Sequence, residues 1–90
     1  MISIEYAPKF LKKFKKLEFS VQEEVREKIN LFKDRSNHQK LRVHKLHGNL
    51  SDCWAFYVNY QKRIVFEYLT DNHVAMLSID DHDVYKRLKR

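Results

Sequence analysis

The sequence predicts an α+β fold, in which an N-terminal strand and a helical hairpin pack on one face of a mostly antiparallel, four- to five-stranded sheet. Two patterns point to it. Apolar residues recur at helical spacing between positions 8 and 32, and they alternate every second position between 53 and 79. The chain has 90 residues, so we expect one domain over residues 1–90.

Composition excludes several classes of protein. Hydrophobic residues make up 43% of the chain, which is too many for a disordered segment. The one cysteine, Cys53, can form no disulfide within the chain, which excludes a disulfide-stapled secreted module. The sequence has no signal-peptide pattern and no long apolar run, so we expect a cytoplasmic protein with no membrane partner. The net charge of +6 favours a polyanion or an acidic protein as partner.

A short strand and a first helix are expected at the N-terminus. Hydrophobicity alternates along residues 2–6, which predicts a strand. Pro8 then suits the first turn of a helix, where its missing N–H is not needed. The apolar stripe of this helix consists of Phe10, Phe14 and Leu17. The lysines of its other face are Lys9, Lys12, Lys13, Lys15 and Lys16. They are either a binding surface or a solvated face.

A second helix is expected to begin near Val21, because Ser20 and Glu23 fit the S-x-x-E capping box. Its apolar stripe consists of Val21, Val25, Ile29 and Phe32. It ends in the polar run 34–37, and the short connection to the first helix makes the pair a helical hairpin.

The second half of the chain predicts a meander of strands. Residues 41–46 are either a short strand or an extended lead-in, and the sequence Gly48-Asn49 is typical of a turn. Strands are expected over 53–60, 63–69 and 73–79, with a turn at 71–72. The charged tail over 84–90 is compatible with a short helix.

Alternation along these strands assigns their faces. The large apolar sets must face the helices: Trp54, Phe56, Val58 and Tyr60 in one strand, and Ile64, Phe66 and Tyr68 in the next. The residues between them point the other way, so Tyr57, Arg63 and Glu67 are expected together on the open face of the sheet.

Phosphodiester chemistry fits the polar residues best. Cleaving RNA through its own 2′-hydroxyl needs a base, an acid for the leaving oxygen and a cation for the charge on phosphorus. His82 is a side chain of the type that titrates near neutral pH, and Arg63 offers a planar, permanently charged fork. Tyr57 and Tyr85 offer rings for base stacking or a phenol for proton transfer. In the structural alternative, Arg63 pairs with Glu67 and His82 only ends a strand.

Other chemistries have weaker support. His44 and His47 are three positions apart, but no paired cysteines or nearby carboxylate complete a ligand set, so we expect no metal and no cofactor. Cys53 begins an apolar strand with no helix N-terminus before it, so we expect a small core residue. The sequence has no glycine-rich phosphate loop.

The order of several sequence segments resembles that of a known protein family, and the resemblance covers essentially the whole chain. After the N-terminal strand and two helices come Leu46-His47-Gly48-x-Leu50, Cys53-Trp54, Lys62-Arg63-Ile64-Val65-Phe66 and Ile79-Asp80-Asp81-His82-Asp83-Val84-Tyr85. The arrangement resembles the RelE/ParE superfamily of bacterial toxins, which come from type II toxin–antitoxin pairs.

The resemblance implies a toxin that acts as a ribosome-dependent mRNA endoribonuclease, an mRNA interferase, and arrests translation without a metal. Its partners would be mRNA on the ribosome and a cognate acidic antitoxin, which would neutralise it within an oligomer. RelE-like members use an arginine in the sequence Arg-[Leu/Ile]-Val-[Tyr/Phe], here Arg63. They also use side chains at the end of the last strand, here His82 and Tyr85. His44 and His47 have parallels in histidine-rich members.

One departure from RelE leaves alternatives open. RelE carries lysines that bind RNA and stabilise the transition state at positions where this chain has Ala55 and Tyr57. The chain is therefore either a histidine-based nuclease or a degenerate homologue that only binds an antitoxin. The ParE branch shares the fold and poisons DNA gyrase without nuclease activity. Arg63, His82 and Tyr85 favour the nuclease.

Overall fold

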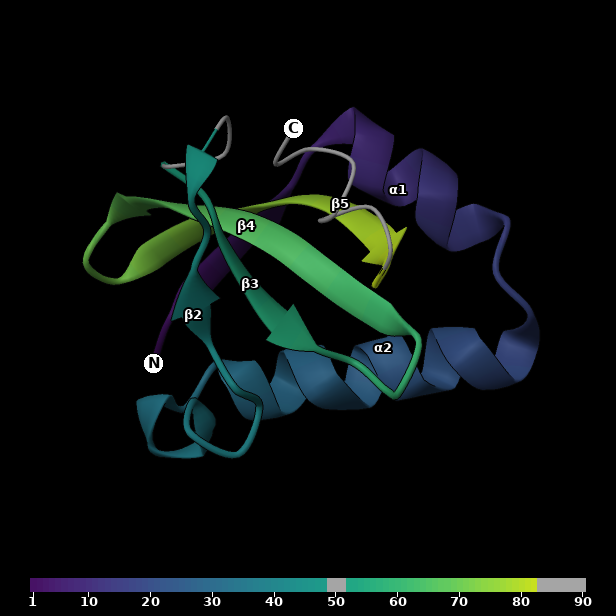
Figure 1. The fold of residues 1–90 in the computed structure, drawn as a ribbon, viewed down its shortest axis with the longest axis horizontal. Helices are drawn as coiled ribbons and strands as arrows, with labels where there is room; N and C mark the ends of the chain where they lie inside the picture. The colour runs from purple at the N-terminus through teal and green to yellow at the C-terminus, as the bar shows by residue number, and fades with distance from the viewer. Residues whose placement is uncertain (49–51, 83–90) are drawn as a thin grey trace.

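The computed structural model describes residues 1–48 and 52–82, and it confirms the α+β class (Figure 1). The elements in chain order are β1 (Ser3–Tyr6), α1 (Pro8–Lys15), α2 (Phe19–Phe32), the 3-10 helix η1 (Arg35–Asn37), β2 (His44–Lys45), β3 (Trp54–Tyr57), β4 (Lys62–Thr70) and β5 (His73–Asp81). The expected tail helix over 84–90 lies outside the described residues. Within the described residues, no helix has the length and apolar character needed to cross a membrane.

The strands of the described residues form one five-stranded sheet in the order β1-β5-β4-β3-β2. The pairs β2–β3, β3–β4 and β4–β5 are antiparallel, and β1 lies parallel to β5. The sheet is therefore mostly antiparallel, as predicted. β4 and β5 are neighbours, so the start of β4 lies beside the end of β5, with Arg63 opposite Asp80.

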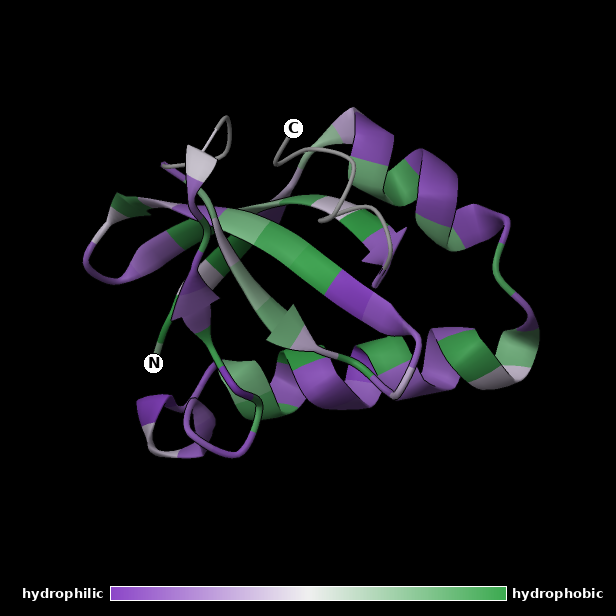
Figure 2. Cartoon of the chain, viewed as in Figure 1, coloured by the Kyte–Doolittle hydropathy of each residue, from purple (hydrophilic) through white to green (hydrophobic). Residues whose placement is uncertain are grey.

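Both helices share a core with one face of the sheet. Phe10 of α1 and Phe32 of α2 are buried with residues from β3, β4 and β5. The Phe32 ring centroid lies 4.7 Å from that of Phe56 and 4.8 Å from that of Phe66. Figure 2 shows the matching pattern, with hydrophobic and hydrophilic residues alternating around α2. The predicted helical hairpin on one face of the sheet is therefore confirmed.

The predicted start of the second helix is wrong by two residues. α2 begins at Phe19, and Glu18 precedes it without a side-chain capping bond. The backbone N–H groups of Val21 and Gln22 already donate to the Glu18 carbonyl, so Ser20 lies inside the helix and cannot cap it. The residue expected to complete the capping box, Glu23, pairs instead with Arg26 at 2.9 Å.

Two strand boundaries also differ from expectation. The ambiguous run 41–46 is a two-residue strand, β2, preceded by a turn in which Arg42 has the left-handed value φ 57. The strand expected over 53–60 ends at Tyr57, so the prediction that Tyr60 faces the core is wrong, and its side chain is 92% exposed. The Asn59 carboxamide explains this, because it bends the chain by accepting hydrogen bonds from the next residues.

The sheet face opposite the helices is partly covered. A second, smaller apolar cluster lies there, formed by Leu46, Ala55 and Val65 with Cys53 and Leu77 packed beside it. The face that the sequence predicts to be open therefore carries apolar packing along part of its length.

Candidate functional site

A hollow of about 840 Å³ lies where α2, the turn before β2, the β3–β4 turn and the end of β5 meet. Its lining residues are Lys28, Lys40, Leu41, Arg42, Tyr57, Val58, Asn59, Tyr60, Gln61, Lys62, Arg63, Asp81 and His82. Five of them are lysine or arginine, and one is acidic. We call this site the basic hollow, because its charge favours an anionic ligand.

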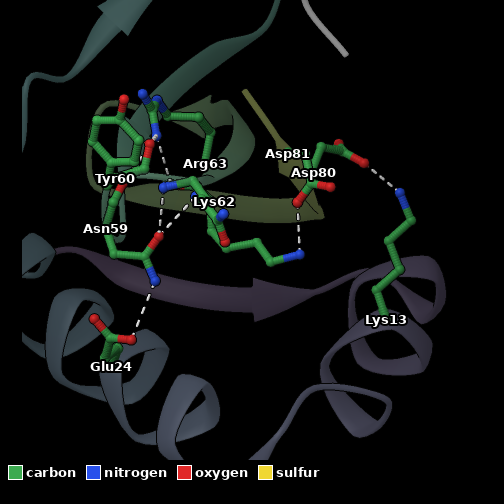
Figure 3. Close-up of polar contacts among 9 residues, drawn as sticks. Lys13, Glu24, Asn59, Tyr60, Lys62, Arg63, Asp80 and Asp81 are labelled. Atoms are coloured by element: carbon green, nitrogen blue, oxygen red, sulfur yellow. Dashed lines mark hydrogen bonds and ion pairs between the residues drawn. The ribbon is translucent and has the colours of Figure 1, made fainter. Parts of the chain in front are cut away.

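Asn59 shapes the turn that forms one wall of the basic hollow (Figure 3). Its Oδ1 accepts hydrogen bonds from the backbone N–H groups of Gln61 and Lys62, both at 2.8 Å. Its Nδ2 donates to the Glu24 carboxylate of α2 at 3.2 Å. One side chain thus folds the β3–β4 turn and ties it to α2, which Figure 1 shows passing beside that turn.

Arg63 lies under this turn and is 4% exposed. Its Nη1 donates to three backbone carbonyls: Asn59 at 2.9 Å, Lys62 at 3.1 Å and Tyr60 at 3.3 Å. Its Nε is buried without a hydrogen-bond partner among the described residues. Arg63 is on the predicted side of the sheet, but the prediction that it lies in the open is wrong, because the carbonyls of the turn enclose its guanidinium.

Tyr57 covers the guanidinium of Arg63. The two residues are cross-strand partners in β3 and β4, and the Arg63 Cζ lies 3.4 Å from the centroid of the Tyr57 ring. Such stacking of a cation on an aromatic face is attractive. The Arg42 guanidinium lies 5.4 Å from the same centroid, so Tyr57 contacts two cations of the basic hollow.

His82 stands beside Arg63 at the end of β5. Its Nδ1 lies 3.3 Å from the Arg63 Nη2, and its backbone N–H donates to the Gln61 carbonyl at 2.8 Å. The preceding residue, Asp81, pairs with Lys62 at 2.6 Å. The structure therefore brings together Arg63 and His82, which are 19 positions apart in sequence. Tyr85, the third expected site residue, lies outside the described residues.

The other candidate residues divide into two groups. His44 stands at the margin of the basic hollow, with its ring centroid 6.4 Å from that of Tyr57, and its Nδ1 donates to the Arg42 carbonyl at 2.7 Å. His47 is exposed and does not line the hollow. Glu67 is on the Arg63 side of β4, but among the described residues it forms no ion pair with Arg63. The Arg63–Glu67 ion pair of the structural alternative is therefore absent among the described residues.

Cys53 has the surroundings of a packing residue. Burial raises the pKa of its thiol, and the negative charges of Glu67 and Asp52 raise it further. A raised pKa lowers the fraction of reactive thiolate. In the described part of the chain, no three histidine, cysteine or acidic side chains gather as ligands for a metal ion.

Sequence reasoning missed most of the cations in the basic hollow. Lys28 comes from α2, Lys40 and Arg42 from the turn before β2, and Lys62 from β4. Two of them are close in sequence to predicted site residues, because Lys62 adjoins Arg63 and Arg42 lies two positions before His44. The net charge of +6 indicates that some basic surface exists, but the fold decides which cations meet.

Comparison with known proteins identifies the fold. No model of a protein family matches the chain, and no curated protein sequence matches it. Among solved structures, a conserved hypothetical protein from Helicobacter pylori matches with TM-score 0.70 and 19% identity, over 92% of this chain and 97% of that one. A YoeB–YefM complex from Staphylococcus aureus matches with TM-score 0.70 and 19% identity, over 91% and 98%. An archaeal RelE–RelB complex from Pyrococcus horikoshii matches with TM-score 0.69 and 14% identity, over 89% and 93%. The chain therefore has the RelE/ParE-like fold that the sequence indicates.

Proposed function

We propose that this chain is the toxin of a type II toxin–antitoxin system and that it cleaves mRNA on the ribosome as a metal-independent endoribonuclease. Solved structures with the same fold include toxin–antitoxin complexes from Staphylococcus aureus and Mycobacterium tuberculosis. This likeness supports the role of a toxin that an antitoxin protein neutralises.

The observation that carries the nuclease proposal is the basic hollow with Arg63 and His82 in contact inside it. Lysine and arginine side chains neutralise RNA phosphates, and aromatic rings stack on unpaired bases. Tyr60 is 92% exposed on the turn at the edge of the hollow, so its ring is available for stacking. The combination suits a single strand of RNA better than a small neutral ligand.

The proposed reaction is an internal transfer of the phosphate. The 2′-oxygen loses its proton and attacks phosphorus, the bond to the 5′-oxygen breaks, and that oxygen takes up a proton. Cations stabilise the charge that develops on the phosphate oxygens, and histidine and tyrosine side chains handle protons and hydrogen bonds. We assign these roles to Arg63, His82 and Tyr85, with His44, His47, Tyr57 and Glu67 as further candidates for RNA binding or catalysis.

The departure from RelE is compatible with this proposal. Ala55 is fully buried and does not line the basic hollow. Positive charge near Tyr57 comes instead from Arg42, Lys40 and Lys28, which line the same hollow. The cations thus come from other elements, and His82 supplies an imidazole beside Arg63.

The test is mRNA cleavage on programmed ribosomes. His82→Ala should lower the cleavage rate by about a hundredfold or more, the usual effect of losing a proton-handling group. His73→Ala is the matched control, because His73 starts the same strand and pairs with Glu5 outside the basic hollow. It should cleave at the wild-type rate. Intact mRNA with wild-type protein, together with gyrase-dependent DNA breaks after induction, would favour the gyrase-poison alternative.

A further inference from the structure

The guanidinium of Arg63 is held in place without any help from a ligand. Three carbonyls of the β3–β4 turn accept from Nη1, and the Tyr57 ring covers one face of the group. Arg63 is only 4% exposed, whereas Lys40 and Arg42 of the same hollow are exposed. An RNA phosphate entering the hollow therefore meets these side chains before it meets Arg63.

The contact between Arg63 and His82 fixes the position of a proton. An arginine side chain carries only hydrogen-bond donors, so the Nδ1 of His82, 3.3 Å from Nη2, must be the acceptor. An imidazole nitrogen that accepts carries no proton. In the neutral ring the proton then lies on the other nitrogen, Nε2.

From this geometry we infer that Arg63, in addition to the charge-stabilising role proposed for it above, is a positioning residue: it fixes His82 as the tautomer protonated on Nε2, so that His82 donates a hydrogen bond to an RNA phosphate in the basic hollow. The second half of this inference rests on the proposed function. The Nδ1 of His82 is then not the base that removes the 2′-hydroxyl proton, because the Arg63 hydrogen bond occupies it.

A second contact anchors the backbone of His82. The His82 N–H donates to the Gln61 carbonyl at 2.8 Å, in the same turn whose other carbonyls hold Arg63. The turn thus anchors both partners of the Arg63–His82 contact. Within the imidazole ring, Nδ1 and Nε2 lie on opposite sides of Cε1, so the nitrogen that carries the proton is directed away from Arg63.

Nitrogen NMR of the histidine rings, on the full chain without RNA, tests the tautomer. Wild-type His82 should show an unprotonated Nδ1 and a protonated Nε2. His44 is an internal reference, because its Nδ1 lies 2.7 Å from a carbonyl and must carry a proton. In Arg63→Lys a cation remains for the turn, but the Nη2 that reaches His82 is lost, so the His82 Nδ1 signal should shift. A proton on Nδ1 in the wild type, or an unchanged His82 spectrum in Arg63→Lys, would overturn the inference.

Binding of a short single-stranded RNA with 2′-O-methyl groups, which cannot be cleaved, tests the donor role. Glutamine can place an amide donor near the position of Nε2, and asparagine places one near Nδ1. His82→Gln should therefore keep the wild-type affinity within about threefold, and His82→Asn should weaken it on the order of tenfold, as for one lost hydrogen bond to a charged group. Equal loss in both variants would overturn the donor role. Failure of the wild-type chain to bind this RNA would instead count against the proposed function, while the NMR result would still decide the role of Arg63.

Discussion

At the scale of single residues, Arg63 is a buried cation whose Nη1 donates hydrogen bonds to backbone carbonyls. A buried charge is costly unless hydrogen bonds compensate it, and the Asn59, Tyr60 and Lys62 carbonyls do so here. Those carbonyls depend on Arg63 in return. Arg63 therefore contributes to the stability of the turn as well as to the candidate site.

We expect Arg63→Ala to lower the free energy of unfolding by about 1–3 kcal/mol, because buried carbonyls of the turn lose their donor. Arg63→Lys should lose less, since an ammonium can still donate to the turn. Urea denaturation of both variants measures the difference. If Arg63→Ala unfolds at the wild-type midpoint, the turn does not depend on the guanidinium. A loss of activity in Arg63→Ala thus reports stability together with chemistry, and His82→Ala is the cleaner test of mechanism.

The sequence predicted correctly on which side of the sheet a side chain lies, because the alternation of a strand alone decides this. Alternation places Tyr57 and Arg63 on the same side of the sheet, and they are direct cross-strand partners. Their burial could not be predicted in this way. It depends on the register between β3 and β4 and on the Asn59 turn, which directs carbonyls at the guanidinium. The alternation pattern specifies neither the register between the two strands nor the hydrogen bonds of the turn.

At the scale of elements, the end of α2 is fixed to the sheet by Phe32, which is fully buried and stacks on Phe56. Phe32→Ala should cost about 3–5 kcal/mol of unfolding free energy, because it leaves a cavity among aromatic rings. Phe19→Ala, at the other end of the same helix, is the control, since Phe19 is 73% exposed. Denaturant melts should leave Phe19→Ala within about 0.5 kcal/mol of the wild type. Equal losses in the two variants would contradict this packing.

The contact between α1 and β5 predicts a dependence of stability on pH. Burial alone would raise the pKa of Asp80, but hydrogen bonds from Lys13 and Ser78 and the positive charges of Lys13 and Lys9 hold it below its usual value. Figure 3 shows the contact between Lys13 and Asp80. A carboxylate with a lowered pKa stabilises the fold above the pKa of the unfolded state, about 3.9, and this contribution is lost as pH falls through the lower folded value. Asp80→Asn should therefore flatten the acid side of the stability curve.

Denaturant unfolding of wild type and Asp80→Asn from about pH 2 to pH 6 measures this effect. The stability gap between the two proteins should be largest at the upper end and shrink towards the lower end. A gap that does not change with pH would mean that the Asp80 charge is not what holds α1 to β5.

The helical and strand periodicities predicted which helices and strands exist. They did not predict the features that depend on pairing between distant parts of the chain. The stripe from Val21 to Phe32 identified α2 because its packing repeats along the helix. The parallel pairing of β1 with β5 carries no local signal, since Ser3 pairs with His73 near the other end of the chain. The basic hollow has the same origin, because its walls meet only when the sheet forms.

At the scale of the whole molecule, positive charge exceeds what the fold itself neutralises. The chain carries +6, and the cations in ion pairs of the described residues are Lys13, Arg26, Lys62 and, when protonated, His73. Lys9, Lys12, Lys15 and Lys16 of the α1 region are exposed. Lysines at spacings of three and four on one helix repel each other by a few tenths of a kcal/mol each. An acidic partner would relieve this repulsion, as the proposed antitoxin would.

The association rate with the proposed acidic antitoxin should therefore fall by about tenfold or more as salt rises from about 20 mM to 500 mM, because screening shortens the reach of electrostatic steering. The dissociation rate should change far less, since it depends on the contacts made in the complex. Stopped-flow mixing with the isolated antitoxin measures both rates. Lys12→Glu in α1 should slow association at low salt and lose that effect at high salt, whereas Lys45→Glu, in β2 at the opposite edge of the sheet from β1, reports the effect of net charge alone. If Lys12→Glu and Lys45→Glu slow association equally, the total charge steers the antitoxin and the α1 lysines are a solvated face. A rate that does not respond to salt would rule out electrostatic steering altogether.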